Sequence, residues 1–143
     1  MAYVDGDDSN IGVSLNTRYL ARSGKSIEYA SAAVEEYKAF FDIKVANEDR
    51  ELDEEGFTGY SPSEEIDAVW HTHISFLKRY QCDTLYLTGR KRVIEHSPLL
   101  YMYMDAADNY NRSYEAHETK MSEQGKQVNT DFWTEPESFA SCG

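Results

Sequence analysis

Histidines and a cysteine gather in one part of this 143-residue chain, where they could bind a metal ion. Three of the four histidines, His71, His73 and His96, fall within 26 residues, and Cys82 lies between them. Imidazole nitrogen and thiolate sulfur are the ligands that zinc most often takes in proteins. A metal site is therefore the first hypothesis that this sequence raises, and it depends on the elements that carry these residues.

Helix rotation separates the two neighbouring histidines. In an α-helix, residues two positions apart are rotated by about 200° from each other. His73 shares its face with Val69 and Trp70, whereas His71 points away from that face. On a straight helix Cys82 would lie about 13 Å along the axis from His73. One ion bound by His71, His73 and Cys82 is therefore excluded unless the helix is broken.

His73 and His96 could still meet, because the connection from residue 82 to residue 96 is long enough to fold back over the helix. A divalent transition ion such as zinc would suit this pair, and His71 would join it only if the helix opens. Two other interpretations of His73 stay open. It is either a buried neutral imidazole, hydrogen-bonded to a carbonyl, a carboxylate or a tyrosine hydroxyl, or a contact for acid–base chemistry or a ligand.

Other residues that could carry chemistry are interpreted mainly as core. Trp70 is more simply a core anchor than a platform on which a ligand stacks, and Cys82 is expected to be a small buried side chain. Tyr103, Tyr110 and Tyr114 follow a helical spacing that His117 continues, so all four are expected to be structural, or the tyrosine hydroxyls line a polar pocket. The nucleophile, phosphate-binding and dinucleotide-binding motifs of common enzymes are absent, so no reaction is assigned.

The elements that must position these residues are helical. Apolar residues recur at steps of three and four over about 26–45, 62–82 and 98–122, which predicts three main helices. The second helix has the clearest start, because Ser61 can cap it, Pro62 suits its first position and Glu64 completes a capping box. It could gain a further turn before Gly89, which is expected to stop it.

These elements predict an all-α fold in which three main helices form a small bundle. We expect an N-terminal arm over residues 1–22 that is either flexible or packed on the core. A single helical domain over 23–136 and a C-terminal tail over 137–143 are expected to follow it. Six acidic residues within 48–55 predict an acidic loop, and the N- and C-terminal segments are expected to be irregular.

Composition narrows the class of partner. Hydrophobic residues make up 41% of the chain, and 11 Tyr, 6 Phe and 2 Trp are enough aromatic residues to build an ordered core. The formal net charge of −12 repels a phosphate backbone, so no nucleic-acid partner is expected. The longest apolar run, residues 99–104, is too short to cross hydrocarbon about 30 Å thick.

Cysteine usage and the N-terminus predict the compartment. The first ten residues contain neither a basic stretch nor an apolar one, unlike a secretory signal. Cys82 and Cys142 are the only cysteines, and their wide separation favours free thiols in a reducing environment. An intracellular, cytoplasmic location is therefore the expectation.

Residues 61–136 resemble the glycine-rich-domain-containing-protein-like family. The resemblance rests on Ile66-Asp67-Ala-Val-Trp70-His71-Thr-His73, followed by Tyr80, Cys82-Asp83 and His96-Ser-Pro98. Family domains carry a similar I/V-D-x-x-W-H-x-H helix with a following H-x-P, whereas their closing Phe-Gly is replaced here by Gln124-Gly125. The resemblance implies a helical domain without an established reaction. It also implies a site at five positions: Trp70, His71, His73, Tyr80 and His96.

Two functions follow as hypotheses. The first is a small, soluble, acidic helical binding module that contacts a protein or a small ligand, or that serves as a subunit of a larger assembly. The second is a metal-binding protein or metalloenzyme in which His73 and His96 are ligands and His71 is a further candidate. The sequence does not decide whether the protein is an enzyme.

Overall fold

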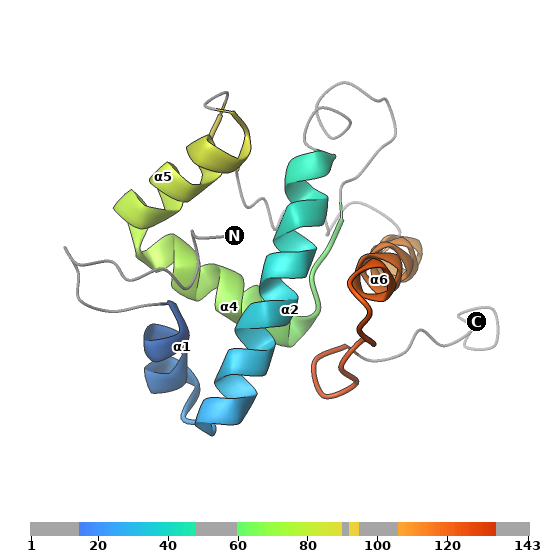
Figure 1. Ribbon diagram of the computed structural model, residues 1–143, viewed down its shortest axis with the longest axis horizontal. Helices are drawn as coiled ribbons and strands as arrows, with labels where there is room; N and C mark the ends of the chain where they lie inside the picture. The colour runs from blue at the N-terminus through green and yellow to red at the C-terminus, as the bar shows by residue number, and fades with distance from the viewer. Residues whose placement is uncertain (1–14, 48–59, 90–91, 95–105, 134–143) are drawn as a thin grey trace.

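The computed structural model describes residues 15–47, 60–89, 92–94 and 106–133. Within these ranges the chain forms five helices and no strand: α1 (Leu15–Ser23), α2 (Ile27–Ala46), α4 (Glu64–Ser75), α5 (Leu77–Leu87) and α6 (Ala106–Glu123) (Figure 1). The all-α prediction is confirmed for this part of the chain. The bundle of three main helices is not confirmed, because α1 and α5 are additional helices. None of the described helices is long and apolar enough to cross a membrane.

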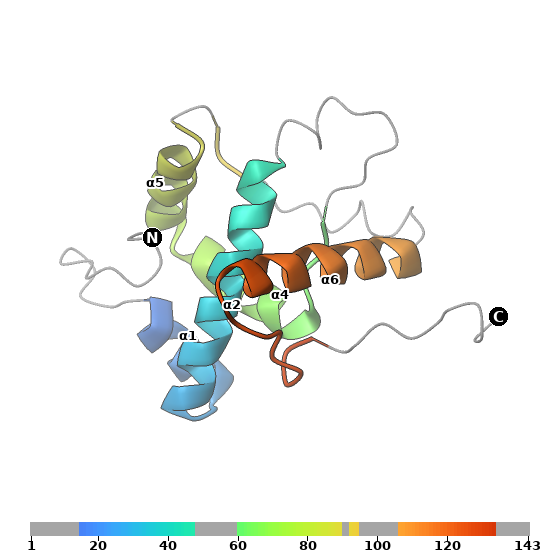
Figure 2. The same ribbon diagram turned by 45° about the vertical axis from the view of Figure 1, so that its right-hand side comes forward.

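The central element is α2, which contacts α1, α4 and α6 and is crossed by α6 (Figure 2). It confirms the helix predicted over 26–45. The hydroxyl of Ser26 caps it by accepting a hydrogen bond from the Tyr29 N–H at 3.1 Å. Ile27 begins the predicted apolar face but is 66% exposed. The rest of that face is buried in the core: Ala30, Val34, Tyr37 and Phe41.

The single helix predicted over 62–82 is wrong, because the chain breaks between α4 and α5. Phe76 has φ −89° and ψ 66°, which is not helical, and its ring is buried beneath the guanidinium of Arg18 at 3.3 Å. The break lets α5 turn back beside α4 (Figure 1). Residues ten apart, which a straight helix would hold about 15 Å apart, can therefore touch.

The start of α4 also differs from the prediction. Ser63, not Ser61, caps the helix, since its hydroxyl accepts a hydrogen bond from the Ile66 N–H at 3.2 Å. Ser61 instead joins this segment to α6. Its N–H donates to the Ser113 hydroxyl at 2.7 Å, and its own hydroxyl donates to Asn109 Oδ1 at 2.6 Å.

Part of the predicted N-terminal arm is α1, which packs against α2 and α4. Leu15 and Tyr19 point into the core from this helix. Gly24 ends it with φ +66°, and the Gly24 N–H donates to the Leu20 carbonyl at 3.2 Å. Residues 15–23 therefore contribute to the folded domain.

The end of α6 matches the prediction within a residue, and the chain then returns to the core. Gly125 has φ +71°, and the Lys126 N–H donates to the Met121 carbonyl at 2.8 Å, which closes the last turn. Trp133 lies fully buried against Phe40, with ring centroids 6.0 Å apart. The first residues of the helix predicted over 98–122, the acidic loop and the 137–143 tail lie outside the described residues.

Candidate functional site

Two of the predicted site residues, Trp70 and Tyr80, form a buried hydrogen-bonded pair. Trp70 Nε1 donates to the Tyr80 hydroxyl at 3.0 Å, and that hydroxyl donates to the Ile94 carbonyl at 2.7 Å. Trp70 is 0% exposed and its ring packs on Phe40 and Phe41. The interpretation of Trp70 as a core anchor is confirmed.

His73 lies in the same core and uses both ring nitrogens. Nδ1 is 2.6 Å from the Tyr37 hydroxyl and Nε2 is 2.8 Å from Asp83 Oδ2. A carboxylate only accepts hydrogen bonds, so Nε2–H donates to Asp83. In a neutral imidazole Nδ1 then accepts from the Tyr37 hydroxyl. Arg79 Nε also donates to Asp83 Oδ2, at 3.3 Å. Of the interpretations left open for His73, this geometry matches the buried imidazole bonded to a carboxylate and a tyrosine hydroxyl.

His71 faces the opposite way, as the rotation of the helix predicts. Its Nε2 is 3.4 Å from Asp67 Oδ2, one turn earlier on the exposed side of α4, and its side chain is 52% exposed. The two neighbouring imidazoles therefore belong to different environments, one in the core and one at the surface.

The predicted metal ligands are not brought together in the part of the chain that the structure describes. His96 lies outside it, and Cys82, expected to be buried, is an exposed free thiol on α5. Because the helix is broken at Phe76, the separation of about 13 Å between His73 and Cys82 no longer applies. No group of three or more His, Cys, Asp or Glu side chains among the described residues could hold a metal ion. The pairing of His73 with His96 stays a prediction.

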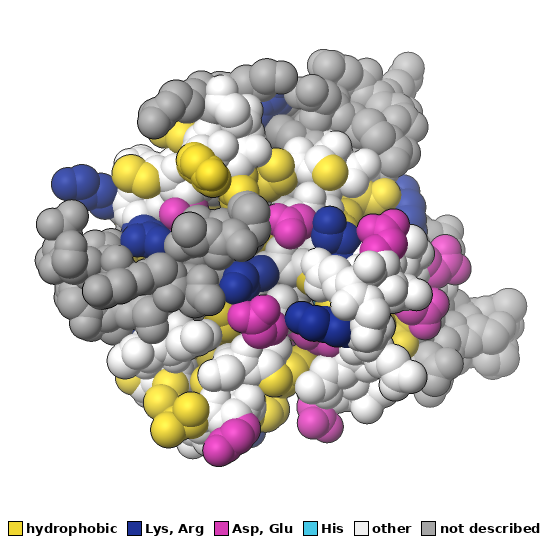
Figure 3. All heavy atoms as spheres, in the orientation of Figure 1, with side chains coloured by type: hydrophobic (Ala, Val, Ile, Leu, Met, Phe, Trp, Pro, Cys, Tyr) yellow, Lys and Arg dark blue, Asp and Glu magenta, His cyan; other side chains and the backbone are white. Residues whose placement is uncertain are grey.

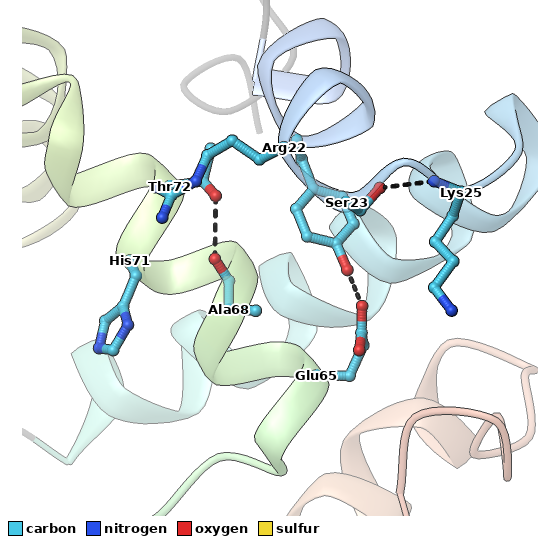
Figure 4. A pocket seen from close by; sticks show the side chains of 8 residues that line it. Arg22, Ser23, Lys25, Glu65, Ala68, His71 and Thr72 are labelled. Atoms are coloured by element: carbon cyan, nitrogen blue, oxygen red, sulfur yellow. Dashed lines mark hydrogen bonds between the residues drawn. The ribbon is translucent and has the colours of Figure 1, made fainter.

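A surface pocket of about 300 Å³ lies between α1 and α4, and His71 is one of its residues (Figure 4). We call it the α1–α4 pocket. Its lining combines two cations, a carboxyl group, an imidazole, three hydroxyls and an alanine methyl: Arg22, Lys25, Glu65, His71, Tyr19, Ser23, Thr72 and Ala68. Its volume lies at the lower end of the range of small-ligand sites, and its lining is more polar than is usual for them.

Hydrogen bonds hold the walls of this pocket. The Tyr19 hydroxyl donates to Glu65 Oε1, which joins α1 to α4 (Figure 4). Thr72 Oγ1 donates to the Ala68 carbonyl at 2.9 Å, and the Lys25 N–H donates to Ser23 Oγ at 3.2 Å. The walls are therefore ordered, while the ends of the long cationic side chains remain exposed.

Comparisons with known proteins found no match for this chain, whether among family models, curated proteins or solved structures. Any function is therefore argued from this chain's own residues.

Sequence reasoning missed the cationic half of the α1–α4 pocket. Arg22 falls in the segment expected to be an arm, and Lys25 falls between that arm and the first predicted helix. The local charge could have indicated this cationic wall. Residues 15–27 contain three basic residues and no acidic one, on a chain whose net charge is −12.

A second polar cluster, in the core between α2 and α6, was also missed. Glu36 Oε1 accepts a hydrogen bond from the Asn129 N–H at 2.6 Å, and Glu36 Oε2 is 3.5 Å from His117 Nε2. The His117 ring stacks on Trp133 with centroids 4.6 Å apart. These contacts attach the returning segment after α6 to α2, and they confirm that His117 is structural.

Glu65 gives the pocket a pH-dependent group. Burial raises the pKa of the Glu65 carboxyl above its ordinary value of 4.5. The folded protein therefore binds this proton more tightly than the unfolded chain does. Its contribution to stability is present at low pH and is lost as the pH rises from that ordinary value through the higher folded value.

We expect Glu65→Gln to become more stable relative to the wild type as the pH rises from about 4 to about 7. Urea unfolding at both pH values measures the difference. Glu64→Gln is the matched control, because it removes the same charge from an exposed neighbour, and its change with pH is expected to be smaller. Equal pH dependence in the two variants would contradict the assigned role of burial at Glu65.

Proposed function

We propose that this domain is a binding module for a small ligand, with the α1–α4 pocket as its contact site. The observation that carries the proposal is the separation of the two histidines. His73 is 1% exposed and its two ring nitrogens face Tyr37 and Asp83, so its ring is closed off from the surface by core side chains. His71 lies instead at the surface in a pocket that also holds two exposed cations.

The residues of the W-H-x-H motif divide into core residues and one surface residue. Three residues of this region are buried in the core, and each forms a hydrogen bond with another part of the chain: Trp70, His73 and Tyr80. His71 is the exposed histidine of the W-H-x-H motif. We also propose that the domain is related to the glycine-rich-domain-containing-protein-like family. Its partner is proposed to be something other than a nucleic acid.

The metal-binding hypothesis gains no support from the contacts of His73. An ion at Nδ1 would have to displace the Tyr37 hydroxyl, and an ion at Nε2 would have to displace Asp83. Either change would leave a buried polar group without its partner, which costs about 1–3 kcal/mol. A binding module is therefore the function that these contacts support better.

Amide spectra of the ¹⁵N-labelled protein test the proposed contact site. A set of small molecules of different charge, comprising anions, cations and neutral aromatic compounds, is titrated into the protein. We expect at least one of them to shift the amides of residues 19–25 and 65–72 saturably, while those of residues 77–84 in α5 move little. Saturable shifts centred on α5 or α6 instead, or no saturable shift with any compound, would overturn the proposal.

A further inference from the structure

We infer that the α1–α4 pocket binds a small, doubly charged oxyanion, such as a phosphate monoester or a dicarboxylate, through Arg22 and Lys25. This inference rests on the proposed function and adds the chemical class of the ligand. It is carried by where the basic side chains of residues 15–27 lie and by which of them have a carboxylate partner among the described residues.

The three basic side chains of residues 15–27 are not equivalent. Arg18 is already engaged, since its guanidinium lies 3.3 Å from the centroid of the Phe76 ring. Arg22 and Lys25 come after it, at the end of α1 and in the turn to α2, and both are exposed. They are the two basic side chains of this segment that line the α1–α4 pocket.

Neither cation forms an ion pair with a carboxylate among the residues that the structure describes. Elsewhere Lys38 is 3.1 Å from Glu35, and Arg79 is 3.3 Å from Asp83. On the face shown in Figure 3, basic and acidic side chains likewise lie intermixed. Lys25 Nζ lies 5.5 Å from the centroid of the Tyr29 ring, but its side chain is exposed. The charges of Arg22 and Lys25 therefore remain available to an anion.

The number and the chemistry of the two cations favour a doubly charged oxyanion as the ligand. Figure 4 shows Arg22 extending from α1 toward Thr72 on α4, whereas Lys25 extends in another direction. The cations flank the pocket instead of forming one cluster. A guanidinium binds oxyanions through paired N–H groups, and an ammonium acts as a compact point charge. Because both cations line one pocket, a ligand that carries two negative charges matches their combined charge.

The remaining charged groups of the pocket modulate this binding. Glu65 opposes an anion, but one of its carboxyl oxygens already accepts from Tyr19. His71 adds positive charge when protonated, and it faces Asp67 on the same helix. Removing the charge of Glu65 is therefore expected to strengthen binding of an oxyanion.

The test is a titration of the ¹⁵N-labelled protein with inorganic phosphate and, separately, with succinate, at constant ionic strength set by potassium chloride. We expect saturable shifts at the amides of Ser23, Lys25 and Thr72. Saturation with phosphate identifies a phosphate-like ligand, and saturation with succinate alone identifies a dicarboxylate. Either result supports an oxyanion site.

Two double variants decide whether the named cations are responsible. Arg22→Gln with Lys25→Gln is expected to weaken binding about tenfold or more. Lys78→Gln with Lys126→Gln removes the same charge from exposed positions outside the pocket and should bind as the wild type does. Glu65→Gln should bind more tightly than the wild type.

Equal weakening in the two double variants would overturn the inference, because net charge alone would then explain the binding. So would the absence of saturation with both anions. If neutral or cationic compounds alone shift these amides, the oxyanion inference is wrong while the proposed binding site stands. If no compound shifts them, both proposals fail.

Discussion

Replacing Trp70 with alanine is expected to lower the free energy of unfolding by about 3–5 kcal/mol. The indole is 0% exposed and extends from α4 into the core, where it contacts the rings of Phe40 and Phe41 on α2 and the Tyr80 hydroxyl on α5. Its removal leaves a large cavity and takes the N–H donor away from the Tyr80 hydroxyl. Chemical denaturation followed by circular dichroism measures the loss.

Tyr80→Phe separates packing from hydrogen bonding at this place. It keeps the ring but removes the hydroxyl that links Trp70 to the Ile94 carbonyl, so we expect a smaller loss of about 1–3 kcal/mol. A loss near zero for Trp70→Ala would show that the indole is not a core anchor. Trp70 would then have to be considered as a contact residue for a ligand.

Part of the fold could be predicted because it depends on local periodicity. The helix over 26–45 has a regular apolar face and a capping serine, and both are present in α2. The break at Phe76 could not be predicted in this way, since the apolar spacing continues from Trp70 through Leu77 without interruption. The break depends on burial of the Phe76 ring under Arg18, which is a contact between distant segments.

The same distinction holds for the candidate site. The opposite orientation of His71 and His73 follows from helix rotation alone, so it could be predicted. The partners of His73 could not, because Tyr37 comes from α2 and Asp83 comes from α5 after the break. The cationic wall of the α1–α4 pocket depends on α1, a helix of nine residues whose position is set by its contacts with α2 and α4.

Asp83→Ala is expected to lower the free energy of unfolding by about 3 kcal/mol. Asp83 is buried and accepts hydrogen bonds from His73 Nε2 at 2.8 Å and from Arg79 Nε at 3.3 Å. Removing the carboxylate leaves the imidazole donor in the core without an acceptor. Arg79, which is partly exposed, can turn to water instead. Urea unfolding of the variant measures the cost.

The chain supplies its own matched control, because the other histidine of the motif also faces an aspartate. Asp67→Ala removes the partner of His71 on the exposed side of the same helix and should cost less than about 1 kcal/mol. Asp83→Asn should recover part of the loss, since its amide oxygen can still accept from His73. If Asp67→Ala and Asp83→Ala destabilise equally, the two imidazoles share one environment. The division of α4 into a buried structural face and an exposed binding face would then be wrong.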